Sequence, residues 1–114
     1  MYDLSVVGAG WAGFNAALRA KELGLKVCLI EIGQIGGTCL NRGCIPTKAL
    51  IQSAKALSLT RKSETFGLEA VTARINFSKV QERKEKIVGQ LQQGMRSLLN
   101  DIDFFNSEAE ILSN

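Results

Sequence analysis

Short apolar runs and helical spacing alternate along the first part of the chain. Residues 2–7 form an apolar run that ends abruptly at a glycine-rich stretch, residues 8–13. Apolar side chains then recur at helical spacing over residues 14–23, and a second apolar run covers residues 26–31. Apolar runs bounded by turn residues are typical of buried strands, and the spacing between them is typical of a helix packed on one face. The pattern predicts a strand–helix–strand unit.

Helical spacing dominates the rest of the chain. It predicts a helix over about residues 45–58, a loop over 60–72 and a long helix over about 78–99. Two short strands are predicted at 102–106 and 108–112. The long helix carries an apolar stripe, with charged residues elsewhere, formed by Val80, Ile87, Leu91, Met95 and Leu98.

The order of these elements predicts a parallel sheet. The second strand should pair beside the first, and the strand at 102–106 should add to its outer side, which gives the order 3-2-1. The fold class is therefore α/β, an incomplete doubly wound, Rossmann-like domain with a parallel sheet and a long helix. The free edge of the first strand, with Leu4, Val6 and Val7, and the apolar stripe would then lack a cover. We expect the chain to self-associate.

Composition narrows the function classes. The 114 residues fit one small domain, and the net charge of +3 is mild, with no dense basic block. We therefore expect no nucleic-acid partner. No apolar run approaches the roughly 18 residues of a membrane span, and the opening Met1-Tyr2-Asp3 is unlike a signal peptide. A cytoplasmic protein with no membrane partner is predicted.

The glycine-rich turn after the first strand has the spacing Gly8-x-Gly10-x-x-Gly13. In a strand–turn–helix context the first glycine makes the tight turn, the second lets a pyrophosphate approach the backbone, and the third allows the helix to pack closely on the strand. Glu31, at the end of the second strand, is positioned to bind ribose hydroxyls. The motif predicts a dinucleotide site but does not distinguish FAD from NAD.

Two cysteines lie in the segment GGTCLNRGCIPTK, residues 36–48, and allow three interpretations. A zinc site usually needs four Cys or His ligands, whereas the chain has only Cys28 besides Cys39 and Cys44 and contains no histidine, so no metal site is expected. A structural disulfide would close a very short loop and would be reduced in the cytosol. A redox-active pair remains.

The position of Cys44 favours the redox pair. It lies at the predicted start of a helix, where Pro46 is tolerated in the first turn and where the helix N-terminus stabilises a thiolate. We therefore expect Cys44 to be the thiol with the lowered pKa and Cys39 to be ordinary. Cys28, between Val27 and Leu29 in a buried strand, is predicted to be an inert core residue.

The glycine turn, Glu31 and above all the cysteine segment resemble the FAD-binding N-terminus of the flavoprotein (pyridine nucleotide) disulfide reductases. Within this family the neighbouring residues are most similar to those of the dihydrolipoamide dehydrogenases, although glutathione and mercuric reductases share the outline of the motif. These neighbours are Leu40, Asn41, Ile45, Pro46 and Thr47. Trp11 departs from the pattern, because relatives have a small residue or proline there. Its ring is expected either to cover the phosphate site or to pack outward.

The resemblance implies roles for single residues. Cys44 would lie next to the flavin, and Cys39 would exchange with the substrate disulfide. Lys48 would lie near the reactive edge of the flavin ring, and Gly37 and Thr38 would help hold the pyrophosphate. The glycine turn and Glu31 would hold the adenosine half of FAD.

The resemblance also implies a domain assignment and partners. Residues 1–114 would be part of an N-terminal FAD-binding domain, without the NAD-binding and interface domains that complete such enzymes. The parent would move electrons from dihydrolipoamide, or another dithiol or disulfide, through FAD to NAD. It would be a homodimer and could serve a 2-oxoacid dehydrogenase complex. The chain alone would show no turnover, since it lacks a histidine base. A stand-alone FAD- or nucleotide-binding module without turnover is the alternative.

Overall fold

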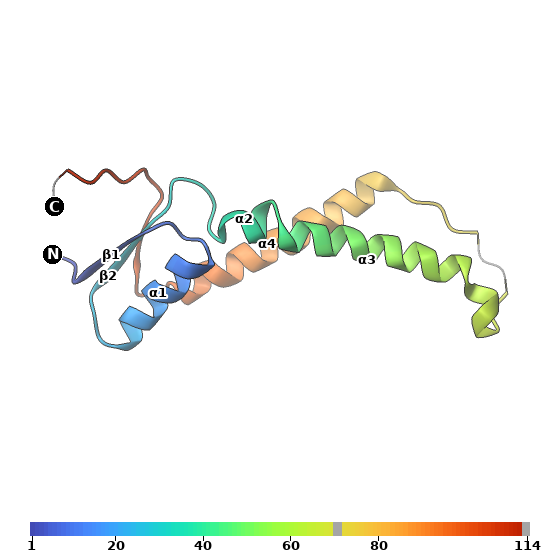
Figure 1. The fold of residues 1–114 in the computed structure, drawn as a ribbon, viewed down its shortest axis with the longest axis horizontal. Helices are drawn as coiled ribbons and strands as arrows, with labels where there is room; N and C mark the ends of the chain where they lie inside the picture. The colour runs from blue at the N-terminus through green and yellow to red at the C-terminus, as the bar shows by residue number, and fades with distance from the viewer. Residues whose placement is uncertain (70–71, 113–114) are drawn as a thin grey trace.

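Three parallel strands and a long pair of helices make up the computed structural model, which describes residues 1–69 and 72–112 (Figure 1). The elements follow the chain in the order β1 (Leu4–Val7), α1 (Trp11–Glu22), β2 (Val27–Ile30), α2 (Gly37–Asn41), α3 (Cys44–Arg61), the 3-10 turn η1 (Ser63–Phe66), α4 (Phe77–Leu98) and β3 (Asp103–Phe105).

The sheet has the predicted order, with β2 between β1 and β3. Leu4 pairs with Val27 at the start of the β1–β2 ladder, and Cys28 pairs with Asp103 at the start of the β2–β3 ladder. Both ladders are parallel. The α/β fold class with a parallel sheet and a long helix, consistent with a Rossmann-like fragment, is therefore confirmed.

The core lies where β2, α1 and the C-terminal half of α4 meet. Leu29 of β2 is fully buried, as are Ile35 and Leu40 from the segment that leads into the two cysteines. Because Ile35 and Leu40 flank the paired glycines, the candidate site is anchored directly on the core. The other buried members are Ala9, Phe14, Ala17, Ala20, Val27, Val88, Met95, Leu99 and Ile102.

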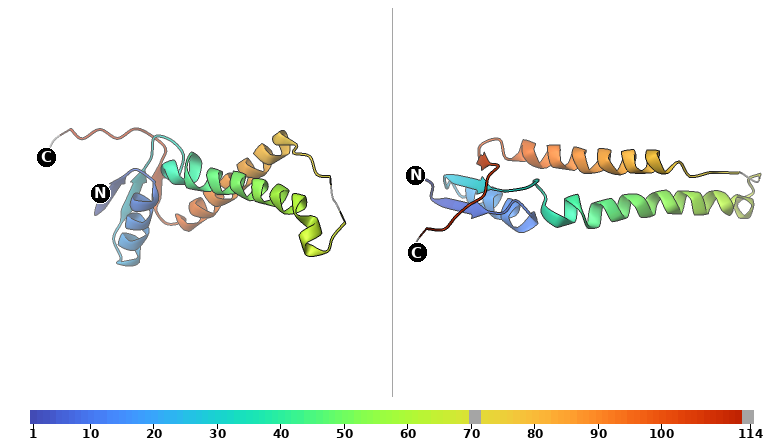
Figure 2. Two further views of the ribbon diagram at one scale, coloured as in Figure 1. Left: turned by 45° about the vertical axis from the view of Figure 1, so that its right-hand side comes forward. Right: turned by 90° about the horizontal axis from the view of Figure 1, so that it is seen from above.

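Beyond the core, α3 and the N-terminal half of α4 lie side by side in opposite directions and form a two-helix arm (Figure 2). The arm gives the molecule extents of 66 × 26 × 20 Å. Arg83 of α4 donates a hydrogen bond of 3.1 Å to the carbonyl of Ala49 in α3, which ties the helices together. Large apolar side chains stay exposed along the arm and at its tip, namely Ile51, Leu59, Phe66, Leu68, Ile75 and Phe77.

Helix boundaries differ from the predicted ones by one to three residues. α1 begins at Trp11, so that the last glycine of the turn belongs to its first turn, and α3 runs from Cys44 to Arg61. The predicted loop over 60–72 is only partly irregular, because it contains the end of α3 and η1, and residues 70 and 71 lie outside the described part of the chain. α2 was not predicted, because five residues are too few to show helical periodicity.

The predicted strand at 108–112 is wrong. Within residues 72–112 the last strand is β3, and the chain beyond it pairs with no other strand. Instead, Glu108 and Ala109 line a hollow of about 190 Å³ beside the C-terminal ends of β1 and β2. The apolar residues that suggested a strand, Ile111 and Leu112, are exposed and bury no surface in a sheet.

The apolar stripe of α4 and the free edge of β1 are exposed only in part. On α4, Met95 is buried while Val80 and Ile87 are half-buried, but Leu91 and Leu98 of the predicted stripe remain exposed. On β1, Val7 keeps 64% of its surface exposed, whereas Val6 packs against the core. No helix among the described residues combines the length and the apolar character needed to cross a bilayer.

Candidate functional site: a glycine turn, a groove and a thiol pair

The glycine turn between β1 and α1 brings helix and strand into direct backbone contact. A Cβ atom on Gly13 would lie 1.9 Å from the carbonyl oxygen of Gly8, so only glycine fits there. Gly8 has φ +98°, a conformation that L side chains rarely adopt. Gly10 is the N-cap residue of α1, and the N–H groups of the first helical turn, which lack helical partners, point out of the turn. The turn at Gly8 and the close packing at Gly13 therefore have the expected geometry, whereas the approach of a pyrophosphate at Gly10 stays a prediction.

Glu31 closes the glycine turn from the neighbouring strand. One oxygen of its half-buried carboxylate accepts a hydrogen bond of 2.7 Å from the N–H of Ala9, and the other accepts one of 2.8 Å from the N–H of Gly33. The carboxylate therefore lies at the end of β2 beside the turn, as the sequence suggested. Each oxygen keeps a further lone pair for a ligand hydroxyl.

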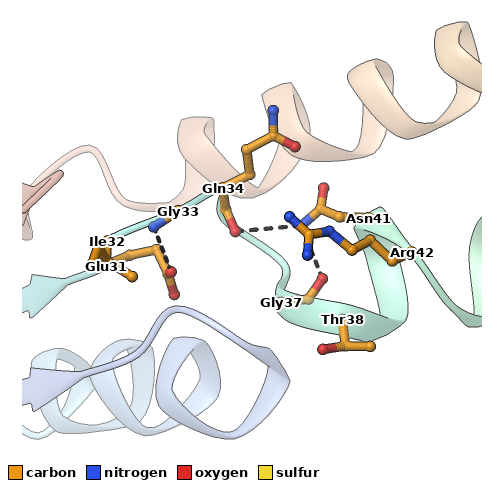
Figure 3. A pocket seen from close by; sticks show the side chains of 8 residues that line it. All are labelled: Glu31, Ile32, Gly33, Gln34, Gly37, Thr38, Asn41 and Arg42. Atoms are coloured by element: carbon orange, nitrogen blue, oxygen red, sulfur yellow. Dashed lines mark hydrogen bonds between the residues drawn. The ribbon is translucent and has the colours of Figure 1, made fainter.

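A groove of about 460 Å³ runs from Glu31 to α2 (Figure 3). It is lined by Glu31, Ile32, Gly33, Gln34, Gly37, Thr38, Asn41 and Arg42. Three predicted site residues, Glu31, Gly37 and Thr38, thus share one cavity. The sequence analysis named Asn41 only as part of the family resemblance and did not predict a role for Arg42. The only sequence signal for either residue was its position within the cysteine segment.

The paired glycines bring this groove up to the glycine turn. Gly36 and Gly37 both have positive φ, +98° and +60°. A Cβ atom on Gly37 would lie 2.9 Å from the Cα of Gly10, so the two backbones touch without side chains between them. The structure therefore brings the first and second glycine motifs together at the N-terminal ends of α1 and α2.

The two cysteines of the segment also come together. Cys39 is the third residue of α2 and is half-buried, while Cys44 is the first residue of α3 and is exposed. Both are free thiols. Gly43 makes the tight connection possible, because a Cβ there would lie 3.1 Å from the carbonyl oxygen of Thr38.

The interaction between the two thiols shifts their pKa values in opposite directions. It lowers the pKa of Cys39 and raises the pKa of Cys44. The indole N–H of Trp11, the backbone N–H of Cys44 and the charge of Lys48 lower the pKa of Cys39 further. Our expectation that Cys44 carries the lowered pKa is therefore wrong. The first N–H of α3 does stabilise a thiolate, but it also bonds to the sulfur of Cys39.

Cys28 lies in the core as expected, whereas the place of Lys48 near a flavin ring stays a prediction. Lys48 is exposed on α3, one turn after Cys44, and its charge favours the thiolate form of both cysteines. Cys28 is buried in β2, where its thiol donates a hydrogen bond of 3.2 Å to the hydroxyl of Ser5. Residues 1–69 and 72–112 hold no group of three or more His, Cys, Asp or Glu side chains that could bind a metal ion.

Trp11 gives the first testable prediction. The residue is 47% exposed, and its indole N–H helps to lower the pKa of Cys39, which neither expected placement of the ring anticipated. Replacing Trp11 by Phe keeps the ring and removes this donor, so the pKa of Cys39 should rise. Alkylation of Cys39 by iodoacetamide, followed by mass spectrometry across pH, should show a midpoint at higher pH.

Tyr2→Phe is the matched control for this prediction. It removes an aromatic donor that bonds to Asp103 at 2.8 Å, far from the thiols in the fold, and should leave the profile of Cys39 unchanged. Equal profiles in the wild type and Trp11→Phe would contradict a role of the indole N–H.

Comparison with known proteins agrees with this geometry. Residues 2–113 match the family described as Pyridine nucleotide-disulphide oxidoreductase. The chain is 42% identical over 113 residues to a dihydrolipoyl dehydrogenase of Bacillus subtilis (strain 168), covering 97% of this chain and 24% of that protein.

Two further relatives have the same name. The chain is 42% identical over 114 residues to a dihydrolipoyl dehydrogenase of Staphylococcus aureus, with 98% of this chain and 24% of the relative covered. It is 45% identical over 106 residues to that of Geobacillus stearothermophilus, with 91% and 23% covered. The chain thus spans about a quarter of the length of these relatives. Because the family match covers nearly all of its residues, the chain belongs to the pyridine nucleotide-disulphide oxidoreductase family.

Proposed function

We propose that residues 1–114 are part of the FAD-binding domain of an NAD-dependent dihydrolipoyl dehydrogenase. The observation that carries this proposal is a pair of free thiols, Cys39 in α2 and Cys44 at the start of α3, next to a dinucleotide-type glycine turn. Glycine turns bind many nucleotides and thiol pairs serve many redox proteins, so the combination is more specific than either part. The named relatives favour this activity over that of a glutathione or mercuric reductase.

The residues around the groove fit the adenosine and pyrophosphate parts of FAD. The contact between Gly13 and Gly8 holds the N-terminus of α1 at the end of β1, where free N–H groups and the helix dipole favour phosphate. Gly10 and Gly37 present backbone without side chains on both sides of that point. Glu31 would accept ribose hydroxyls, and the Thr38 hydroxyl would donate to a phosphate oxygen.

The thiol pair would perform the exchange with substrate. A thiolate of dihydrolipoamide attacks the Cys39 sulfur of a Cys39–Cys44 disulfide, and the second substrate thiol then displaces Cys39, which leaves lipoamide and two reduced cysteines. Two electrons and two protons have then moved from substrate to the pair. Bound FAD would take these electrons onward to NAD. Because Cys39 has the lowered pKa, it would be the better leaving group in this exchange.

The experiment is a combined flavin and thiol measurement on the protein purified in its natural full-length form. One FAD per chain should be released on denaturation, and reduction by NADH should expose two additional thiols. Cys28→Ser should preserve both results, because Cys28 takes no part in the exchange. A protein without flavin, or with a thiol count that NADH does not change, would overturn the proposal. Flavin without the thiol change would favour a binding module.

We also propose that the protein is a homodimer, as the second prediction. Leu98 on α4 and Val7 on β1 are 62% and 64% exposed, and apolar side chains of this size on an uncovered strand edge or helix face favour association. The chain at micromolar concentration should therefore sediment as a dimer or larger species.

Val7→Lys and Leu98→Lys are a matched pair of variants for the homodimer, because each places one charge on one of the two surfaces. The variant that restores a monomer identifies the contact. A wild-type chain that sediments as a single monomeric species would contradict the proposal.

A further inference from the structure

Asn41, the last residue of α2, holds the loop before that helix. Its side-chain N–H groups donate to the carbonyl of Gly37 at 2.9 Å, with a longer contact of 3.3 Å to that of Gln34 (Figure 3). They also donate to the carbonyl of Ile35 at 3.0 Å. An amide nitrogen has two hydrogens, so its donor capacity is fully used. The loop and the helix are thereby fastened to each other through one side chain.

Gln92, in helix α4, binds the side-chain oxygen of Asn41. Its side-chain nitrogen donates to the side-chain oxygen of Asn41 at 2.6 Å and to that of Gln34 at 3.1 Å. Both amide hydrogens of Gln92 are therefore used on the candidate site. The contact spans 51 residues of sequence and joins the long helix to the segment that carries Cys39.

α2 depends on such outside support. It has five residues and no side-chain cap, and so short a helix is not stable on its own. Leu40 anchors its inner side in the core. The hydrogen bonds of Asn41 and Gln92 tie the end of α2 to the loop before it and to α4. Cys39 lies two residues before Asn41, so a rotation of α2 would move its sulfur relative to Cys44.

We propose that Gln92 is a positioning residue for the thiol pair: by orienting Asn41 it fixes α2, and thereby sets the contact of Cys39 with Cys44. This inference rests on the proposed thiol–disulfide function. It assigns a role in that site to a residue of α4, which the motifs of the chain do not include. Without the donor at position 92, the side-chain oxygen of Asn41 loses its partner in α4 and α2 is held less firmly against the long helix. The contact between the two sulfurs is then made in a smaller fraction of molecules.

The test uses Gln92→Met in the natural full-length protein, reduced before measurement. Met has similar length and helix propensity but cannot donate a hydrogen bond. Alkylation of Cys39 by iodoacetamide is followed across pH by mass spectrometry. The midpoint should move to higher pH, and the rate at pH 7 relative to the high-pH plateau should fall about twofold or more, since the thiolate is the reacting form. A change in accessibility alone would scale the rate at every pH without moving the midpoint.

Gln93→Met is the matched control, because Gln93 is the next residue of α4 and its side chain is exposed. It should leave the profile of Cys39 unchanged. Gln92→Ala, which removes the amide by truncation, is the second variant and should give the same shift as Gln92→Met. Profiles for both Gln92 variants that coincide with the wild type would overturn the inference. Failure of the proposed function is a separate result, namely a wild-type protein that forms no reversible Cys39–Cys44 disulfide.

Discussion

Replacing Cys44 by Ser should abolish the reversible redox event of this protein while leaving its fold intact. The two cysteines are free thiols in contact, and their oxidation to a disulfide releases two electrons and two protons. Cys39 alone cannot form this bond within the chain. In a graded glutathione redox buffer, the wild type should lose two titratable thiols on oxidation and regain them on reduction. The variant should lose no pair of thiols at any setting.

The fold should survive this substitution because Cys44 is exposed at the start of α3. Serine at a helix start is well tolerated, and surface changes of this size leave stability almost unchanged, so the melting temperature of the reduced protein should stay within about 2 °C of the wild type. A melting temperature that falls sharply would instead make Cys44 an ordinary structural residue.

Cys28→Ser is the control for the thiol titration and should behave in the opposite way. Cys28 is buried in β2, and a buried hydroxyl in place of the thiol should cost about 1–3 kcal/mol of unfolding free energy. Its reversible oxidation should be unchanged, since Cys39 and Cys44 remain. A Cys44→Ser protein that still cycles reversibly between two thiol counts would disprove the assignment of the redox pair.

The sheet and the long helices could be predicted from the sequence because each carries a repeated pattern. β1 and β2 are apolar runs beside turn residues, and α4 extends for 22 residues with regular spacing. The order 3-2-1 followed from the handedness of parallel crossovers. The segment at 108–112 shows the limit of this reasoning, because its apolar residues Ile111 and Leu112 are exposed and it pairs with no strand.

The candidate site was predictable where a residue type has one physical role. A positive φ or a backbone contact requires glycine, so Gly8 and Gly13 could be placed from their spacing, whereas Gly37 was implied only by the family resemblance. The contribution of Trp11 and Gln92 could not, because it depends on which atoms meet in three dimensions. The direction of the thiol pKa values was missed for the same reason, since the N–H at the start of α3 also reaches the neighbouring sulfur.

Replacing Gly13 by Ala should strongly destabilise the protein, because the backbone leaves no room for one methyl group. The new Cβ would lie 1.9 Å from the carbonyl oxygen of Gly8 and 3.2 Å from the side chain of Val6. The oxygen belongs to the backbone, so α1 must move away from β1. Overpacking of this kind costs about 1–3 kcal/mol or more, and thermal unfolding should show a melting temperature lowered by several degrees. The proposed FAD affinity should fall with it, because the N-terminus of α1 is displaced from the phosphate position.

Two other glycines make this prediction specific. Gly89→Ala adds the same methyl group on α4, where a Cβ meets no atom within 4 Å, and should stabilise the protein by about 0.5–1 kcal/mol because alanine favours the helix. Gly10→Ala is intermediate, since its Cβ would make an ordinary contact of 3.9 Å with Gly37. It should leave the melting temperature near that of the wild type but weaken FAD binding, because the methyl group occupies the path of the pyrophosphate. Equal melting temperatures for Gly13→Ala and Gly89→Ala would mean that α1 does not rest on the Gly8 carbonyl. An unchanged flavin content in Gly10→Ala would contradict the proposal that this turn binds the pyrophosphate of FAD.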